Sequence, residues 1–192
     1  MDVFYLTEAL VILAAGFEEI ETVTIIDVLR RAAVDVTVAG LTANVVEGVH
    51  AIKIVPDKPI DDLKADSFDA VILPGGNPGY KNLRNDQRVI DIVKEASKSN
   101  KIVAAICAAP AVLSDAGVLE GKYCTIYPGM EDELENGGGK PKKDIVVVDG
   151  NIITSRGPAT ALPFALKLAE KLAGKQVAEF VSKKTIANIL RW

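Results

Sequence analysis

One of the two cysteines in this 192-residue chain, Cys107, stands where a nucleophile would be expected. It follows the apolar run 101–106, and the residues two before and two after it, Ala105 and Ala109, are both small. Small residues at these positions are typical of a nucleophile elbow, a strained strand-to-helix turn in which larger side chains would collide. The alternative is a buried structural thiol, because free cysteine is among the most buried residue types. The end-of-strand position and the small flanking residues favour a reactive thiol.

Backbone N–H groups near such a turn would stabilise charge on the sulfur. If a helix begins at Cys107, the N–H groups of Ala108 and Ala109 point near the sulfur, favour the thiolate and offer an anion site. Gly75 and Gly76 follow a neighbouring apolar run and could add N–H donors for an oxyanion or for an oxidised sulfur. A simple tight turn would also account for these two glycines.

Three carboxylates, Glu18, Glu19 and Glu21, open the first expected helix, and Glu18 and Glu21 share one of its faces. A carboxyl group buried beside a thiolate stays protonated and can donate a hydrogen bond to the sulfur. The alternative is that all three are solvent-exposed charges favoured by the helix N-terminus. The spacing does not decide which of the three faces the cysteine.

The remaining candidates for chemistry are few. His50, the only histidine, lies in an expected hairpin far in sequence from the strand ends, so it is a weak candidate for a general base. Cys124 lacks small neighbours, and we interpret it as a core thiol. The two cysteines lack metal-site spacing and the chain has no glycine pattern typical of nucleotide binding, so we predict no metal and no cofactor.

Composition limits the class of protein. With 49% hydrophobic and 25% charged residues, we expect a single domain spanning residues 1–192. The net charge of −4 argues against nucleic acid and anionic membranes as partners, and favours a small metabolite or another protein. No apolar run is long enough to span a bilayer, residues 1–8 lack a basic leader, and two cysteines make no disulfide framework. We therefore expect a cytoplasmic protein.

Strands and helices are expected to alternate along the chain, which indicates a mostly parallel sheet with helices on both faces and ligands at the carboxyl ends of its strands. Residues 74–79 and 137–141 are expected to be loops. The pattern predicts strands at 9–15, 34–39, 68–73, 101–106 and 122–127, a hairpin around 49–55, two strand pieces within 144–154, and helices at 18–33, 86–97, 110–116, 160–172 and 177–189.

These features together resemble the ThiJ/PfpI superfamily and, within it, the DJ-one-like branch that includes the parkinsonism-associated deglycase. The resemblance covers almost the whole chain and rests on separated blocks in the right order, at residues 9–14, 16–23, 73–77, 104–110 and 153–158. It implies an α/β flavodoxin-like sandwich and a homodimer.

The resemblance also implies roles for particular residues. The nucleophile of the family falls on Cys107, its partner acid on Glu21, and its backbone donors on Gly75 or Gly76 and on Ala108. His50 falls where relatives carry Arg or His that can approach the site of the partner subunit.

Two positions depart from patterns known in the superfamily. Some members carry a histidine before the proline that follows the elbow helix, where this chain has Tyr127, so a mechanism that needs that histidine is not supported. The peptidase relatives carry histidine directly after the cysteine, where this chain has Ala108, so a peptidase triad is rejected.

The activity implied is that of a cofactor-independent glyoxalase III-type enzyme or protein deglycase, acting on methylglyoxal, glyoxal or their adducts with amino groups. The main alternative is a redox sensor protective against oxidative stress, or a holdase chaperone, in which Cys107 is oxidised to the sulfinate. A purely structural role would require an unreactive Cys107.

Overall fold

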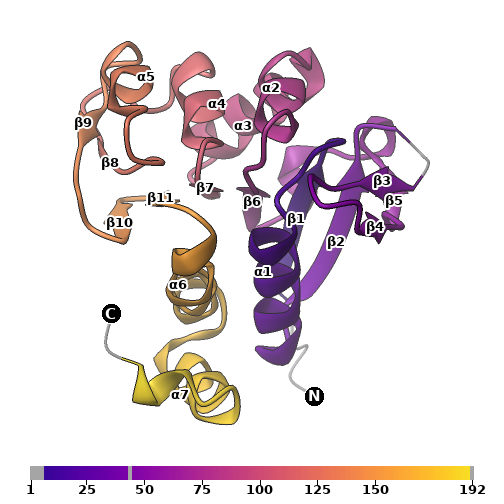
Figure 1. Ribbon diagram of the computed structural model, residues 1–192, viewed down its shortest axis with the longest axis vertical. Helices are drawn as coiled ribbons and strands as arrows, with labels where there is room; N and C mark the ends of the chain where they lie inside the picture. Colours follow the sequence, from indigo (N-terminus) through magenta and orange to yellow (C-terminus); the bar gives the residue numbers. More distant parts are fainter. Residues whose placement is uncertain (1–6, 43–44, 191–192) are drawn as a thin grey trace.

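A seven-stranded sheet forms the centre of the computed structural model, which describes residues 7–42 and 45–190 (Figure 1). The strand order is β10-β11-β7-β6-β1-β2-β5, and every neighbouring pair is parallel except β10 with β11. The strands are β1 (Glu8–Leu13), β2 (Asp35–Gly40), β5 (Lys58–Pro59), β6 (Ala70–Leu73), β7 (Ile102–Ile106), β10 (Val146–Asp149) and β11 (Ile152–Ser155). The ends of the predicted single domain, residues 1–6 and 191–192, lie outside the described residues.

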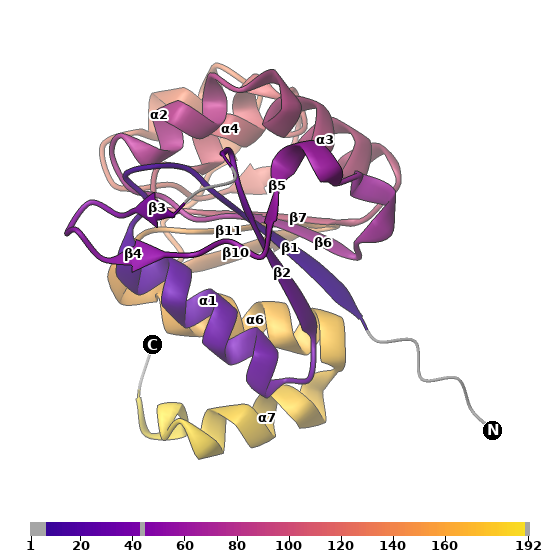
Figure 2. The ribbon, with the colours of Figure 1, turned by 90° about the vertical axis from the view of Figure 1, so that its right-hand side faces the viewer.

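Helices cover both faces of this sheet, so the molecule has three layers (Figure 2). One face carries α1 (Glu19–Arg31) and α6 (Ala161–Ala173), with α7 (Lys175–Lys184) packed against α6. The other face carries α2 (Gly79–Arg84), α3 (Gln87–Lys98) and α4 (Pro110–Asp115). This arrangement confirms the predicted α/β fold with a mostly parallel sheet.

The central strand β1 shows why the sequence folds this way. Leu10 and Ile12 belong to the core cluster that includes α3 and α4, whereas Val11 and Leu13 belong to the cluster that includes α1 and α6. All four side chains are fully buried. A strand covered by helices on both faces needs apolar residues at every position, and this explains the continuous apolar run in the sequence.

Several short elements differ from the sequence-based expectations. Only β8 (Tyr123–Cys124) forms within the strand expected at 122–127, and it pairs with β9 (Lys140–Pro141), inside the segment expected to be a loop. The helices α2 and α5 (Glu131–Glu135) were not predicted. Elements of two to six residues show too little periodicity to be recognised, and their tertiary contacts determine them instead.

Other expectations hold with shifted bounds. The hairpin is present, with β3 (Val46–Glu47) antiparallel to β4 (Lys53–Ile54). β4 lies within the predicted segment 49–55, whereas β3 lies just before it. The last helix is shorter than predicted: α7 ends at Lys184, and Ile186 adopts a left-handed φ of 61°. Among residues 7–42 and 45–190, no helix is long and apolar enough to cross a bilayer.

Candidate active site

Cys107 occupies a sharp turn immediately after β7. Its φ is 63°, a left-handed conformation that costs energy for any residue with a side chain. Two backbone hydrogen bonds hold the turn: the Cys107 N–H donates to the Ser155 carbonyl at 3.1 Å, and the Cys107 carbonyl accepts from the Tyr127 N–H at 2.8 Å. The elbow geometry expected from the small flanking residues is therefore present. Helix α4 begins three residues later, at Pro110, rather than at Cys107.

Two backbone N–H groups act on the sulfur of Cys107 and lower the pKa of its thiol, those of Ala108 and Gly76. The third expected donor, Ala109, does not, because its N–H donates to the Ile106 carbonyl at 3.1 Å. Gly75 does not face the sulfur with its N–H either, since that group donates to Oε2 of Glu21 at 2.8 Å. The Gly76 N–H thus acts on Cys107, and the Gly75 N–H binds Glu21.

Both glycines are required by close approach. A Cβ at Gly75 would lie 2.6 Å from Cβ of Cys107 and 2.8 Å from Oε2 of Glu21. Gly76 has a φ of +101°, and a Cβ there would lie 2.5 Å from the backbone nitrogen of Glu18. The loop after β6 is therefore packed between Cys107 and the start of α1, with no space for a side chain.

Glu21 is the acid that faces the cysteine. It is completely buried on the first turn of α1, and its side chain interacts with that of Cys107. Its Oε2 accepts the Gly75 N–H, while Oε1 has no hydrogen-bond partner among the described residues. A buried carboxyl oxygen without a partner costs free energy, so it is available to exchange a proton with a group placed against it.

The protonation of the two groups follows from burial. The pKa of Glu21 is raised to about 7, mainly by burial and also by the Glu18 charge, while the N–H of Gly75 and the Cys107 side chain act in the opposite direction. Burial and the neighbouring Glu21 raise the pKa of Cys107 to about 12, although the Ala108 and Gly76 N–H groups lower it. The Ala108 N–H thus favours the thiolate as expected, but desolvation outweighs the backbone donors, so the pKa of the thiol is raised overall.

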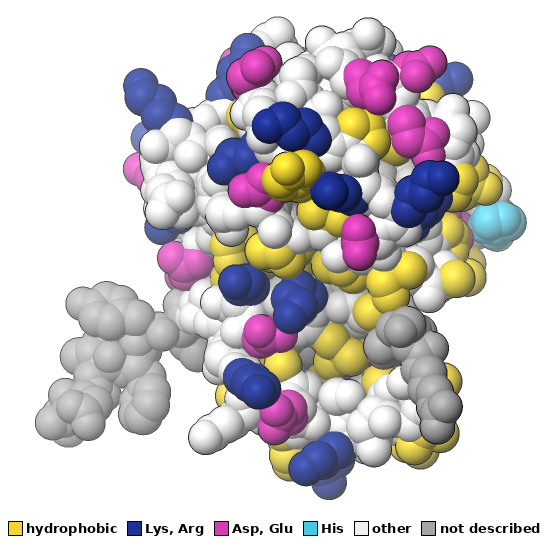
Figure 3. Space-filling view, turned by 90° about the vertical axis from the view of Figure 1, so that its left-hand side faces the viewer, with side chains coloured by type: hydrophobic (Ala, Val, Ile, Leu, Met, Phe, Trp, Pro, Cys, Tyr) yellow, Lys and Arg dark blue, Asp and Glu magenta, His cyan; other side chains and the backbone are white. Residues whose placement is uncertain are grey.

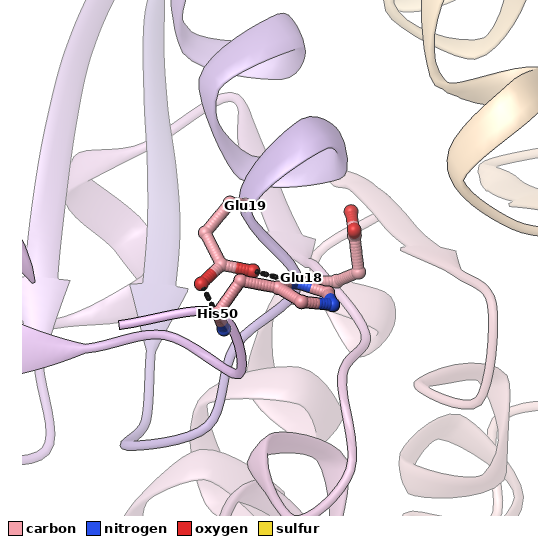
Figure 4. A group of neighbouring side chains, drawn as sticks. All are labelled: Glu18, Glu19 and His50. Carbon is pink, nitrogen blue, oxygen red and sulfur yellow. Dashed lines mark hydrogen bonds and ion pairs between the residues drawn. The ribbon is translucent and has the colours of Figure 1, made fainter. Parts of the chain in front are cut away.

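The other two acids at the start of α1 are also buried, so the view that all three are exposed helix charges is wrong. Oε2 of Glu18 accepts the Glu21 N–H at 2.8 Å and caps the helix. The Glu19 carboxylate accepts the His50 N–H and lies 2.8 Å from the ring nitrogen Nδ1 of His50 (Figure 4). The capping role of Glu18 was missed, although the Glu-x-x-Glu spacing resembles a capping box.

His50 does not meet Cys107 within this chain. Its side chain is 70% exposed, and the single histidine projects from the edge of the face drawn in Figure 3. The ion pair with Glu19 raises the pKa of the imidazole. His50, Glu18 and Glu19 are the described residues whose donor atoms lie close enough for a metal ion, all within 4.8 Å of one another. The Glu19–His50 ion pair satisfies two of these three groups without a metal ion.

Known proteins resemble this chain over most of its length. The model of the DJ-1/PfpI family matches residues 7–171. The chain is 46% identical over 176 residues to Protein dj-1beta of Drosophila melanogaster, covering 91% of this chain and 94% of the relative. It is 38% identical over 159 residues to the glutathione-independent glyoxalase DJR-1.2 of Caenorhabditis elegans, covering 83% and 84% of the two.

A solved structure agrees with these sequence matches. The crystal structure of Drosophila melanogaster DJ-1beta superposes with a TM-score of 0.90 at 44% identity, covering 94% of this chain and 98% of that one. At this similarity the fold and the order of the elements correspond throughout the matched length.

Proposed function

Because the chain belongs to the DJ-1/PfpI family, we propose that it is a cofactor-independent glyoxalase III-type enzyme or deglycase acting on methylglyoxal, glyoxal or their adducts. One observation carries the proposal. A thiol at a strained elbow lies against a buried carboxyl group whose Oε1 has no partner among the described residues. A relative named as a glutathione-independent glyoxalase supports this choice of reaction class.

The first step is addition of sulfur to the aldehyde carbon. With its raised pKa, the Cys107 thiol keeps its proton until attack, and the adjacent Glu21 carboxylate takes that proton as the carbon–sulfur bond forms. The carbonyl oxygen gains the electron pair and becomes an oxyanion. The N–H groups of Ala108 and Gly76, which already face the sulfur, are placed to stabilise it. Protonation of this oxygen gives a thiohemiacetal.

The second step is an internal redox rearrangement. Glu21 removes the proton from the former aldehyde carbon and returns it to the neighbouring carbon, through an enediol, which leaves a thioester on Cys107. Water then cleaves the thioester and releases lactate from methylglyoxal, or glycolate from glyoxal. One water is consumed and no external oxidant is needed. A carboxyl group with a pKa near 7 suits this role, because it exchanges its proton readily at neutral pH.

Lactate formation from methylglyoxal, without glutathione or added cofactor, tests this proposal. We expect turnover by the wild-type protein and none above background by Cys107→Ala. Removal of the free dicarbonyl also lowers adduct formation, so preformed adducts must be assayed separately to distinguish a deglycase from a glyoxalase. A wild-type protein that forms no lactate and releases no adduct would contradict the proposal.

The alternative, a redox sensor, is supported by the same contacts. A sulfinate on Cys107 would receive hydrogen bonds from the Ala108 and Gly76 N–H groups and from a protonated Glu21. Two oxygen atoms added to Cys107 by mild peroxide, measured by intact mass, are expected under this alternative. A holdase role would add suppression of client aggregation by the oxidised protein.

We further propose that two copies of the chain form a homodimer through the outer face of α1 and the β3–β4 hairpin. Apolar side chains are exposed on both elements, and Val23 of α1 and Val55 beside β4 line one surface hollow. The exposed apolar residues of this face are Ile20, Val23, Val49, Ile52 and Val55. His50 lies on the same hairpin and would approach the partner subunit there.

Light scattering during gel filtration tests the dimer. We expect a dimeric mass for the wild-type protein and a monomeric mass for Val23→Glu, because a buried unpaired charge is costly at an interface.

On the face in Figure 3, basic and acidic side chains are interspersed, which supports a small-molecule substrate over a nucleic acid.

A further inference from the structure

The glutamate that caps α1 lies next to the proposed proton carrier, yet the proposed mechanism does not use it. Oε2 of Glu18 accepts the backbone N–H of Glu21 at 2.8 Å. Glu18 is 8% exposed and Glu21 is 0% exposed, so the two carboxyl groups share a region largely shielded from water. Their interaction is therefore screened much less than that of two surface charges.

Capping the helix does not require a negative charge. An N-cap needs an oxygen that accepts an N–H of the first turn, and Ser, Thr, Asp and Asn do this best. A glutamate at this position supplies the oxygen and adds a full charge beside a second buried carboxyl group. A like charge at this range disfavours ionisation of its neighbour.

We propose that Glu18 is a positioning residue whose carboxyl group, held against the first turn of α1 beside buried Glu21, favours the protonated form of Glu21. This inference rests on the proposed function, in which Glu21 exchanges a proton with Cys107. The groups that face Glu21 are Cys107, the Gly75 N–H and Glu18. Glu18 in turn lies near His50, whose ring is paired with Glu19 (Figure 4).

The test measures the protonation of the Glu21–Cys107 pair directly. Iodoacetamide alkylates a thiolate, so the rate of Cys107 alkylation between pH 5 and pH 9 has an inflection where the pair loses its first proton. Peptide mass spectrometry separates Cys107 from Cys124. In Glu18→Gln, which keeps an oxygen for the cap, we expect this inflection to move about one pH unit lower than in wild type.

Three further variants separate charge from capping. Glu18→Ser is a second neutral cap and should move the inflection in the same direction, and it carries the test if Glu18→Gln does not fold. Glu18→Asp keeps the charge and should titrate near wild type. Glu19→Gln is the matched control, because it removes a buried charge one residue along that is not among the groups acting on Glu21.

Two outcomes would overturn the inference: a folded neutral variant at position 18 that titrates like wild type, or a Glu19→Gln shift as large as that of Glu18→Gln. The readout needs no turnover, so it is independent of the proposed reaction. If Glu18→Gln shows the shift but the wild-type protein forms no lactate and releases no adduct, the proposed function is refuted and the role of Glu18 stands.

Discussion

The two cysteines share a raised thiol pKa but differ in backbone conformation and burial. Burial raises the pKa of both, to about 12 for Cys107 and to about 11 for Cys124. Cys107 stands on a strained elbow at the end of β7 and is only partly buried. Cys124 lies in the short strand β8, is fully buried, and has its sulfur 3.7 Å from the Lys122 carbonyl.

The neighbouring carboxyl groups account for the difference between the two thiols. Glu21 lies against Cys107 with Oε1 lacking a partner among the described residues. The carboxyl group that acts on Cys124 belongs to Asp149, which accepts the Tyr123 N–H at 2.8 Å and pairs with Lys122 at 3.7 Å. A raised thiol pKa therefore does not distinguish the proposed nucleophile from the core thiol. Access to the sulfur and a neighbouring proton acceptor are the features that differ between them.

Exchanging each carboxyl group for its amide should give the largest contrast between the regions. Glu21→Gln should lower kcat/KM for lactate formation by about 10²–10⁴-fold, the usual contribution of a positioned acid or base. Asp149→Asn, its counterpart beside Cys124, should stay within about twofold of wild type, because it touches no reacting atom. Steady-state kinetics of both variants make the comparison, and equal losses would remove the distinction.

Peroxide should distinguish the two sulfurs by access. We expect Cys107 to gain oxygen at least about tenfold faster than Cys124, because oxidation of a fully buried thiol must await local opening of the structure. Peptide mass spectrometry over a time course gives both rates in one sample. Faster oxidation of Cys124 would show that its strand opens more readily than its burial indicates.

The pH dependence of activity should reveal the Glu21–Cys107 pair. The pKa of Glu21 is raised to about 7, so its proton is present below that pH and lost above it. Proton abstraction needs the ionised carboxylate, and kcat/KM should therefore rise about tenfold from pH 6 to pH 8. An unperturbed thiol would instead give an inflection near pH 8.5, and that result would exclude Glu21 as the titrating partner.

Replacing Cys124 should lower stability more than replacing Cys107, which is the reverse of the order expected for reactivity. Cys124→Ala should lower the free energy of unfolding by about 1–2 kcal/mol, because it removes a tightly packed buried sulfur. A Cβ at Gly139 would lie only 2.8 Å from that sulfur, which shows how closely the site is packed. Cys107→Ala should cost less than about 0.5 kcal/mol, since it also removes a desolvated thiol from beside Glu21. Urea unfolding of the two variants measures the difference.

Local signals in the sequence were enough for the fold and for the nucleophile candidate. The apolar run around Leu10 predicts a strand buried on both faces, because a strand between two layers of helices needs apolar residues at consecutive positions. The small residues at 105 and 109 predict an elbow for a steric reason that acts within five residues. The structure has both features.

Spacing alone left three acids as partners of Cys107, and only the resemblance to a family singled out Glu21. Tertiary structure then decided the rest. It assigned the Gly76 N–H to the sulfur and the Gly75 N–H to Glu21, placed Glu19 on His50, and made Glu18 a cap. It also raised the pKa of both partners, since desolvation depends on what covers a group and not on its neighbours in sequence. Residues 21, 75 and 107 meet only because β1, β6 and β7 run parallel, side by side.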